Sequence, residues 1–407
     1  MLSQNILHNN ICPTCGSKDI QTFYKLKRVP VHSVLIMHTR EEALNYQYGD
    51  ISLGFCKQCG FISNFAFDPK QHEYSSEYES TQWCSPTFNA FAKRLARHLV
   101  ERYDLYEKDI LEIGCGQGEF LFLLCEYGNN RGIGFDPAYV EGRLQSEASE
   151  RITFIKDFYS EKYVDYQADI IICKMTLEHI HQTSEFVGTV RKSISDRSNT
   201  IVFFQVPDVT RILNEIAFWD IYYEHCSYFN LDSLAYLFRI HDFNVNDIWT
   251  DYDDQYVMIE TQPIRATCDL RKPEVVNITD FERRISDFTK SYQDVFEGWK
   301  QKLQEYMDKG QRIVLWGAGS KGVSFLTTLN IKEEIQYAID INPIKHGTYM
   351  AGTGQMIVAP SFLGEYKPDA VIVMNPIYCQ EIQLSLSEMG LNPELIPVDS
   401  LSSKDSS

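Results

Sequence analysis

The chain has 407 residues, of which 44% are hydrophobic, and a formal net charge of −18. This length exceeds one ordinary hydrophobic core, so two or three domains are expected. The negative charge repels polyanions, so we do not expect DNA or RNA as partners. No window approaches eighteen uninterrupted apolar residues, and no basic-then-apolar signal segment opens the chain. The sequence therefore predicts a cytoplasmic protein without a membrane partner.

Two matched C-x-x-C-G motifs mark the first predicted module, at residues 1–75. Their four cysteines are Cys12, Cys15, Cys56 and Cys59. Four thiolates in two such pairs predict a closed, tetrahedral and structural zinc site in a zinc-ribbon module. A redox dithiol or disulfides are the rival interpretations, and a reducing compartment favours neither. His32 and His38 lie between the motifs and are interpreted as packing or substrate-facing residues.

A polar and aromatic segment follows at residues 74–88, rich in tyrosines and hydroxyl groups. It leads into an apolar helical pattern that includes Phe91, Leu95 and Leu99. Such a segment in front of a cofactor domain can close over an active site. The alternative is a solvated loop that packs on the core.

The next predicted domain, at residues 76–262, begins with a short apolar run, three glycines and a helical pattern. The glycines are Gly114, Gly116 and Gly118, and the acid Glu112 precedes them. Glycine permits the tight turn and lets a ligand lie against the backbone. The carboxylate repels a pyrophosphate and favours a cation, such as the ammonium and sulfonium of S-adenosylmethionine. The pattern resembles motif I of class I methyltransferases, which implies a doubly wound α/β sheet; a Rossmann turn without a ligand is the alternative.

Later strands of the same domain supply further candidate cofactor residues. Asp136 ends the second strand and suits a ribose diol, and Asp157 could bond an adenine amino group. A buried strand at 168–173 leads to Lys174, assigned to the cofactor site, and to His179. Because the carboxyl ends of parallel strands line the ligand crevice, His179 is predicted to meet the substrate.

The segment 219–229 combines an imidazole, a carboxylate and several phenols. His225 is the candidate base, since histidine is suited to removing a proton near neutral pH. Glu224 and Tyr222 stand beside it in the sequence. A structural histidine in an aromatic segment is the alternative interpretation.

Residues 277–308 carry apolar side chains every three or four positions, within a linker predicted at 263–308. This spacing predicts one long amphipathic helix that faces a core, although a dimer surface is an alternative. The sequence leaves monomer and homodimer open. The tail, at residues 402–407, is predicted to be disordered.

The last predicted domain, at residues 309–401, is Rossmann-like. It contains Gly317-x-Gly319-x-x-Gly322 after a strand, with Asp340 at the end of the next strand. Alone, this pattern predicts NAD binding. Lys321 adds a charge suited to a diphosphate at a helix N-terminus. Later strand ends add the polar groups Asn342, Lys345, Asn375 and Tyr378.

The zinc motifs, motif I and Tyr222-x-Glu224-His225 together resemble the nucleotide-sugar 3-C-methyltransferase family. The resemblance runs from about residue 12 to residue 397. It implies that His225 removes a proton next to a sugar ketone, with Glu224 and Tyr222 beside it. It also places His179, from an H-I pair, and Tyr78, from a Y-x-S-S segment, in the catalytic site. The C-terminal domain would then hold the nucleotide diphosphate of the sugar; a degenerate domain kept for packing is the alternative.

One segment departs from the family. Its members tend to carry H-G-G followed by an arginine, whereas this chain has Tyr-Asp-Asp-Gln-Tyr at 252–256. Because that segment lies near the substrate in the family, the resemblance does not define the acceptor.

The sequence thus predicts a methyltransferase that uses S-adenosylmethionine and methylates a carbon beside a ketone, on a small molecule such as a nucleotide-sugar. His225 would form an enolate, and Tyr222, His179 and Tyr78 are candidate hydrogen-bond donors to it. The alternatives are an O- or N-methyltransferase, an NAD-dependent oxidoreductase and a non-catalytic adaptor.

Overall fold

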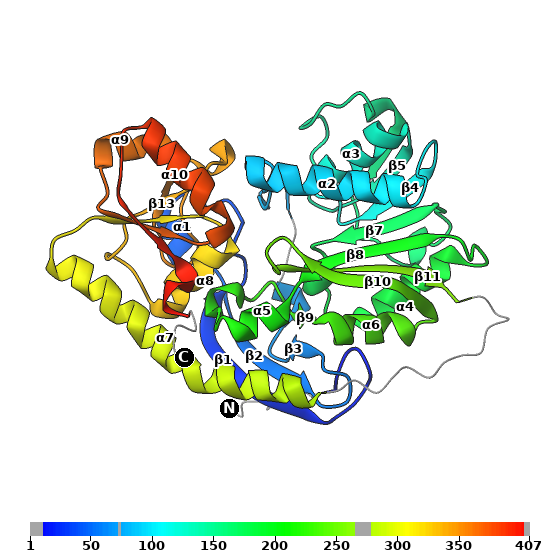
Figure 1. Cartoon of the computed structure of the whole chain (residues 1–407), viewed down its shortest axis with the longest axis horizontal. Helices are drawn as coiled ribbons and strands as arrows, with labels where there is room; N and C mark the ends of the chain where they lie inside the picture. The colour runs from blue at the N-terminus through cyan, green and yellow to red at the C-terminus, as the bar shows by residue number, and fades with distance from the viewer. Residues whose placement is uncertain (1–10, 72–74, 265–277, 403–407) are drawn as a thin grey trace, which may run out of the picture.

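The structure, a computed structural model, describes residues 11–71, 75–264 and 278–402 (Figure 1). It contains sheets of four, seven and five strands. In Figure 1 the seven-stranded sheet lies on the right, the C-terminal sheet on the left, and the N-terminal sheet below and between them. Within the described residues, no helix combines the length and apolar character needed to cross a membrane.

The seven-stranded sheet has the order β10-β11-β8-β7-β4-β5-β6. Its strands are β4 (Asp109–Ile113), β5 (Arg131–Phe135), β6 (Ile152–Ile155), β7 (Ile170–Lys174), β8 (Ile201–Pro207), β10 (Phe243–Asp251) and β11 (Tyr256–Pro263). β11 runs antiparallel to both of its neighbours, and the other pairs are parallel. This arrangement is the predicted class I methyltransferase fold.

Helices cover both faces of this sheet (Figure 1). They are α2 (Pro86–Arg102) and α3 (Glu119–Gly128) on one face, and α4 (Thr183–Ile194) and α6 (Leu231–Arg239) on the other. Successive residues of β4 pack on opposite faces of the sheet. Ile110 packs with α2 and α3, and Leu111 packs with α4 and α6. The near-continuous apolar runs of β4 and β7 follow from burial on both faces.

The four-stranded antiparallel sheet combines two distant parts of the sequence. Its strands are β1 (Ile20–Pro30), β2 (Tyr48–Cys56), β3 (Ile62–Asn64) and β9 (Ser227–Tyr228), with the short helix α1 (Arg40–Leu44) between β1 and β2. β9 begins two residues after the predicted base, His225, and Ser227 pairs with Ser63 of β3. The N-terminal module therefore holds the segment that carries His225.

The C-terminal sheet is entirely parallel, in the order β14-β13-β12-β15-β16. Its strands are β12 (Ile313–Trp316), β13 (Tyr337–Ile339), β14 (Met356–Val358), β15 (Ala370–Val373) and β16 (Glu394–Pro397). Its helices are α8 (Ser320–Leu329), α9 (Leu363–Tyr366) and α10 (Cys379–Glu388). This is the expected Rossmann-like arrangement, with a glycine loop between its first strand and helix.

The predicted long helix is α7 (Thr279–Asp308), which runs beneath the N-terminal and C-terminal sheets (Figure 1). Its buried face includes Phe288, whose ring is 5.8 Å from that of Tyr24 in β1, and Trp299, whose ring is 5.0 Å from that of Phe325 in α8. One hydrophobic cluster consequently joins the N-terminal sheet, α7 and the C-terminal sheet. The rest of the linker, at 265–277, and the tail after residue 402 lie outside the described residues.

Candidate functional site

A cavity of about 620 Å³ lies between the seven-stranded sheet and the C-terminal sheet. The motif I loop, both predicted catalytic histidines and the Gly317 loop all line it. Residues 78–88, which we call the strap, contribute a further wall. The carboxyl ends of parallel strands from both sheets therefore face one shared space.

The motif I loop needs its glycines for conformation and for close packing. Gly114, Gly116 and Gly118 have φ of 68°, 56° and 90°. A Cβ at Gly114 would lie 2.0 Å from Thr176 Oγ1, and a Cβ at Gly118 would lie 2.5 Å from the Phe154 ring. A Cβ at Gly116 would make only an ordinary contact, 3.9 Å from Glu119 Oε2, and the Gly116 N–H donates to Asp136 Oδ2 over 2.8 Å.

Glu112 is a buried acid beneath this loop, and its Oε2 has no hydrogen-bond partner among the described residues. Burial raises the pKa of Glu112, and the nearby cation of Lys174 opposes this rise. Burial likewise lowers the pKa of Lys174, whose Nζ lies 3.7 Å from the centre of the Phe120 ring. A cationic ligand would supply the missing partner of Glu112, so this site fits a sulfonium cofactor.

The two other acids assigned to the cofactor also line the cavity. Asp136 accepts hydrogen bonds from the N–H groups of Gly116 and Ala138, both at 2.8 Å, which fixes the glycine loop. Burial raises the pKa of Asp136 to about 6. Asp157 accepts from the Tyr163 hydroxyl at 2.5 Å and from Lys162 Nζ at 3.0 Å, and the Tyr163 bond is the main cause of its lowered pKa.

Two segments bring predicted catalytic residues together: one follows β7 and carries His179, and the other precedes β9 and carries Tyr222 and His225. The hydroxyl of Tyr222 lies 3.0 Å from Nε2 of His225, and the His179 ring centre lies 4.9 Å from that of His225. Tyr222 and His225 are held close to His179 because the Cys226 N–H donates to the backbone oxygen of Glu178 over 3.0 Å. Burial raises the pKa of Tyr222 well above its ordinary value, so its hydroxyl is a proton donor at neutral pH.

Glu224 is engaged by the N-terminal module. Its Oε2 accepts the Ser33 N–H at 2.8 Å and also the Ser33 hydroxyl, and its Oε1 lies 3.1 Å from Nδ1 of His32. The Ser33 hydroxyl also lies 2.8 Å from the Ser320 hydroxyl of the C-terminal domain. Thus His32, which the sequence assigned to packing or substrate contact, packs against a predicted catalytic residue.

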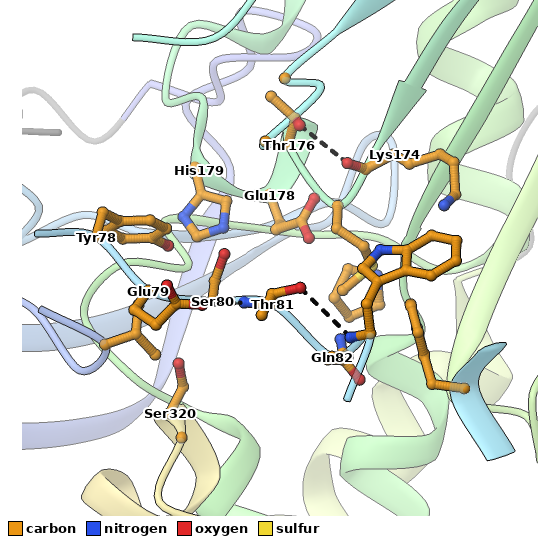
Figure 2. Close-up of a pocket in the computed structure, with 18 of the residues that line it drawn as sticks. Tyr78, Glu79, Ser80, Thr81, Gln82, Lys174, Thr176, Glu178, His179 and Ser320 are labelled. Carbon is orange, nitrogen blue, oxygen red and sulfur yellow. Dashed lines mark hydrogen bonds between the residues drawn. The ribbon is translucent and has the colours of Figure 1, made fainter. Parts of the chain in front are cut away.

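The strap joins the cofactor domain to the C-terminal domain. Glu79 accepts from Arg143 at 2.6 Å and from Asn342 at 3.0 Å. Thr81 donates to Glu119 at 3.0 Å, just after the motif I loop. Tyr78 lines the cavity, and its ring centre lies 6.3 Å from that of His32. Figure 2 shows Tyr78 beside His179, with Glu79, Ser80 and Thr81 of the strap below them and Ser320 lower in the view.

The predicted substrate residues of the C-terminal domain line the same cavity. They are Gly317, Gly319, Lys321, Asn342, Lys345, Asn375 and Tyr378. Lys321 Nζ donates to Asp220 at 2.9 Å and to Gln255 at 3.3 Å, so it bridges the two domains. Burial lowers the pKa of Lys321. The divergent segment 252–256 takes part in this bridge, because Tyr252 donates to the Tyr378 hydroxyl over 2.8 Å and Asn375 donates to Gln255 over 3.0 Å.

The remaining polar lining of this domain is also mutually bonded. Lys345 Nζ lies 3.3 Å from Asp340 Oδ2 and donates to the Ala318 oxygen at 3.2 Å. Arg211, buried in the methyltransferase domain, donates to the same Asp220 oxygen as Lys321. Cations and acids are therefore paired at this end of the cavity.

The four cysteines of the zinc motifs form a separate cluster. Their sulfur atoms all lie within 4.8 Å of one another, with 3.6 Å between Cys12 and Cys59 and 3.5 Å between Cys15 and Cys56. A tetrahedral site with a Zn–S distance of about 2.3 Å needs sulfurs about 3.8 Å apart, so the cluster fits zinc. The cluster lies outside the set of residues that line the cavity, as a structural ion would require.

Comparisons with known proteins match two parts of the chain to protein families. Residues 88–248 match a methyltransferase domain family, and residues 260–392 match the C-methyltransferase C-terminal domain family. The C-methyltransferase NovU of Streptomyces niveus is 25% identical over 305 residues, which cover 71% of this chain and 72% of that protein. The chain is a class I S-adenosylmethionine-dependent methyltransferase. The matches to the C-methyltransferase C-terminal domain family and to NovU support a C-methyltransferase family for this chain.

Solved structures with similar folds cover less than half of this chain in the two matches described next. An O-methyltransferase family protein from Burkholderia thailandensis is 13% identical, with a TM-score of 0.36, and the match covers 44% of this chain and 59% of that one. The chain thus spans less than two thirds of that protein's length. The magnesium protoporphyrin IX methyltransferase of Synechocystis PCC 6803 with bound SAH is 15% identical, with a TM-score of 0.35 and coverage of 44% and 84%.

Several residues of the site were not identified from the sequence. They are Ser33, Glu79, Glu119, Arg143, Glu178, Arg211, Asp220, Gln255 and Ser320. Glu119 directly follows Gly118, and Glu178 directly precedes His179. Their positions next to predicted site residues therefore offered a signal in the sequence. Ser33, Glu79 and Ser320 likewise adjoin His32, Tyr78 and Lys321, and Asp220 and Gln255 lie within the segments 219–229 and 252–256. Arg143 and Arg211 carry no such signal in the sequence.

Proposed function

We propose that this methyltransferase transfers a methyl group to a carbon next to a ketone, on a nucleotide-linked keto-sugar. The observation that carries this proposal is the single cavity shared by the motif I loop, His225 and the Gly317 loop. A cavity of this extent suits an acceptor with one end at the methyl donor and a nucleotide end on the C-terminal domain. The matches to C-methyltransferases support carbon as the methylated atom.

S-adenosylmethionine, when bound, supplies an electrophilic methyl group, and Glu112, the motif I glycines and Asp136 would hold it. His225 removes the proton of the carbon beside the ketone, and its Nε2, next to the Tyr222 hydroxyl, is the nitrogen that receives it. The electron pair of the broken C–H bond delocalises onto the ketone oxygen as an enolate. The enolate carbon then forms a bond to the methyl carbon while the bond from that carbon to sulfur breaks, and its electron pair stays on sulfur. The ketone is restored, S-adenosylhomocysteine leaves, and the proton leaves His225 for solvent.

Tyr222, His179 and Tyr78 are proposed to contact the acceptor oxygen. A hydrogen-bond donor aimed at the developing oxyanion stabilises it more than it stabilises the ketone, and so lowers the barrier. Glu224, held by His32 and Ser33, fixes the loop that carries Tyr222 and His225. The enzyme's contribution to the bond-forming step is the alignment of the two reacting carbons.

The zinc ion is proposed to be structural. Four thiolates would complete its coordination and leave no position for an acceptor oxygen. Its role would be to fold the module that supplies His32 and Ser33 to the site.

The test is the exchange of acceptor hydrogen with deuterated solvent, in the presence of S-adenosylhomocysteine, for a panel of nucleoside-diphosphate keto-hexoses. Carbon methylation through an enolate predicts exchange at one carbon next to the ketone, and product analysis should find the methyl group on the same carbon. An O- or N-methyltransferase would give methylation without exchange at carbon, which would overturn the proposal.

A further inference from the structure

The proposed mechanism leaves the Glu178 carboxyl without a task, although this group lies beside both predicted catalytic histidines. Its side chain is 1% exposed, yet it lines the cavity. Neither of its carboxyl oxygens has a hydrogen-bond partner among the described residues. A buried polar group without a partner costs about 1–3 kcal/mol, so such a group in an active site calls for a ligand.

The position of Glu178 is set by two neighbouring segments. One of its oxygens lies within 4.8 Å of a ring nitrogen of His179 and of His225. The backbone oxygens of Glu178 and Ile180 accept bonds from the Cys226 N–H at 3.0 Å and the Ser227 hydroxyl at 2.7 Å. The carboxyl is therefore fixed at the junction of both histidines. Figure 2 shows it beside His179, facing the strap.

We infer that Glu178 is a catalytic residue whose neutral carboxyl donates a hydrogen bond to the ketone oxygen of the acceptor. The carboxyl keeps its proton throughout. It shares this proton with the oxygen while the enolate exists, and the proton abstracted from carbon goes to His225. The assignment rests on the proposed carbon methylation, because only an enolate or a similar oxyanion would need this donor.

The surroundings of Glu178 favour its neutral form. Among the described residues, no lysine or arginine forms an ion pair with it. Burial raises the pKa of its carboxyl to about 8. The titratable groups that interact with it are thiols, phenols and imidazoles: Cys173, His179, Tyr222, His225, Cys226 and Tyr256. A neutral carboxylic acid in an apolar site is a known kind of oxyanion donor.

A different role for Glu178 would require its ionised form. A carboxylate could pair with protonated His225 after proton abstraction, as the acid of a catalytic triad does. Glu178→Gln separates the two roles, because an amide can still donate a hydrogen bond but carries no negative charge.

The experiment compares Glu178→Gln and Glu178→Leu with the unaltered enzyme and with Glu185→Gln, an exposed glutamate on α4. The readouts are the affinity for S-adenosylhomocysteine, solvent exchange of the acceptor's C–H in its presence, and methyl transfer. We expect Glu178→Leu to retain the affinity and to lose about 10²–10³ in both rates, the usual cost of removing an oxyanion donor. Glu178→Gln should be much less impaired, and Glu185→Gln should match the unaltered enzyme.

Exchange and turnover that persist undiminished in Glu178→Leu would overturn the inference and leave carbon methylation intact. Equal impairment of Glu178→Gln and Glu178→Leu would also overturn it, in favour of the ionised role. Absence of exchange in the unaltered enzyme would overturn the proposed function and, with it, this inference. If Glu178→Leu fails to fold, the pH dependence of the exchange rate provides the test. In the unaltered enzyme the rate should fall at alkaline pH as Glu178 ionises, and in Glu178→Gln this fall should be absent. The same pH profile in both proteins would contradict the inference.

Discussion

Glu224 Oε1 lies 3.1 Å from Nδ1 of His32, although the two residues are 192 positions apart in the chain. The contact joins the module that carries the cysteine cluster to the residue directly before His225. β9 adds a second connection, since Ser227 pairs with Ser63 of the same module. The N-terminal module is thus part of the framework of the candidate site, and we expect the proposed structural zinc to affect catalysis indirectly.

His32→Gln should lower turnover without weakening cofactor binding. His32 contacts Glu224 and lies away from the motif I loop, so it acts as a positioning residue. Loss of one hydrogen bond to a charged group costs about 1.5–3 kcal/mol, which corresponds to roughly a 10- to 150-fold lower kcat. The matched control is His38→Gln in the same module, since the His38 side chain is 67% exposed. Equal kcat for both variants, or a change in KM alone, would contradict the positioning role.

His225→Ala tests the proposed base directly. Turnover should fall by about 10²–10⁴, the usual contribution of a general base, while the affinity for S-adenosylhomocysteine stays unchanged. Exchange of the acceptor's C–H with deuterated solvent should fall to the same extent. His98→Ala, on the outer face of α2, is the control. Exchange that continues in His225→Ala at the original rate would identify another group as the base.

The sequence predicted much of this site because its chemistry is concentrated in short segments. The glycines after β4, the cysteine pairs and the Gly317 loop each combine a turn with the residues that use it, and local spacing reveals such patterns. The partners of Glu224 and Lys321 could not be predicted in this way. His32 and Asp220 reach them from other modules, and only the tertiary fold decides which polar groups meet.

Local spacing also fails to predict the contacts at the C-terminal end of the cavity. The place of Lys321 in a glycine loop predicts contact with a diphosphate, and that role remains a proposal. The structure adds that Asp220 and Gln255 bind its ammonium group. Gln255 belongs to the segment that departs from the family pattern, so the divergent segment contributes to the contact between domains.

Cys56→Ser tests the cysteine cluster. Loss of one of four thiolates should abolish tight zinc binding and lower the melting temperature, because the metal's binding energy contributes to folding. Zinc content by atomic spectroscopy and thermal unfolding are the measurements. Cys379→Ser, a thiol of α10 outside the cluster, should leave both unchanged. A Cys56→Ser protein without zinc that melts at the original temperature would exclude the structural role.

Stability should fall as the pH rises from about 5 to about 8, and Glu178 should be one cause. Burial raises the pKa of its carboxyl in the folded state to about 8, above the ordinary value of 4.5 for an exposed glutamate. Between these values the folded chain binds a proton that the unfolded chain has lost. The free energy of unfolding therefore decreases with pH, by at most about 1.4 kcal/mol per pH unit for one proton. The contribution is complete below the unfolded pKa and is lost as the pH passes the folded pKa.

Asp136 and Asp208, each with a pKa raised to about 6 by burial, act in the same direction at lower pH. The protein has a net charge of −18, and ionisation of its acids increases the charge repulsion within the compact state. The pH profile of the unaltered protein therefore does not separate the effect of Glu178 from this repulsion. Urea unfolding of the unaltered protein and of Glu178→Gln at pH 5, 6.5 and 8 provides the comparison. The variant should show a shallower loss of unfolding free energy between pH 5 and 8, because its amide does not titrate. Parallel pH profiles for the two proteins would mean that Glu178 is already ionised at pH 5 in the folded state.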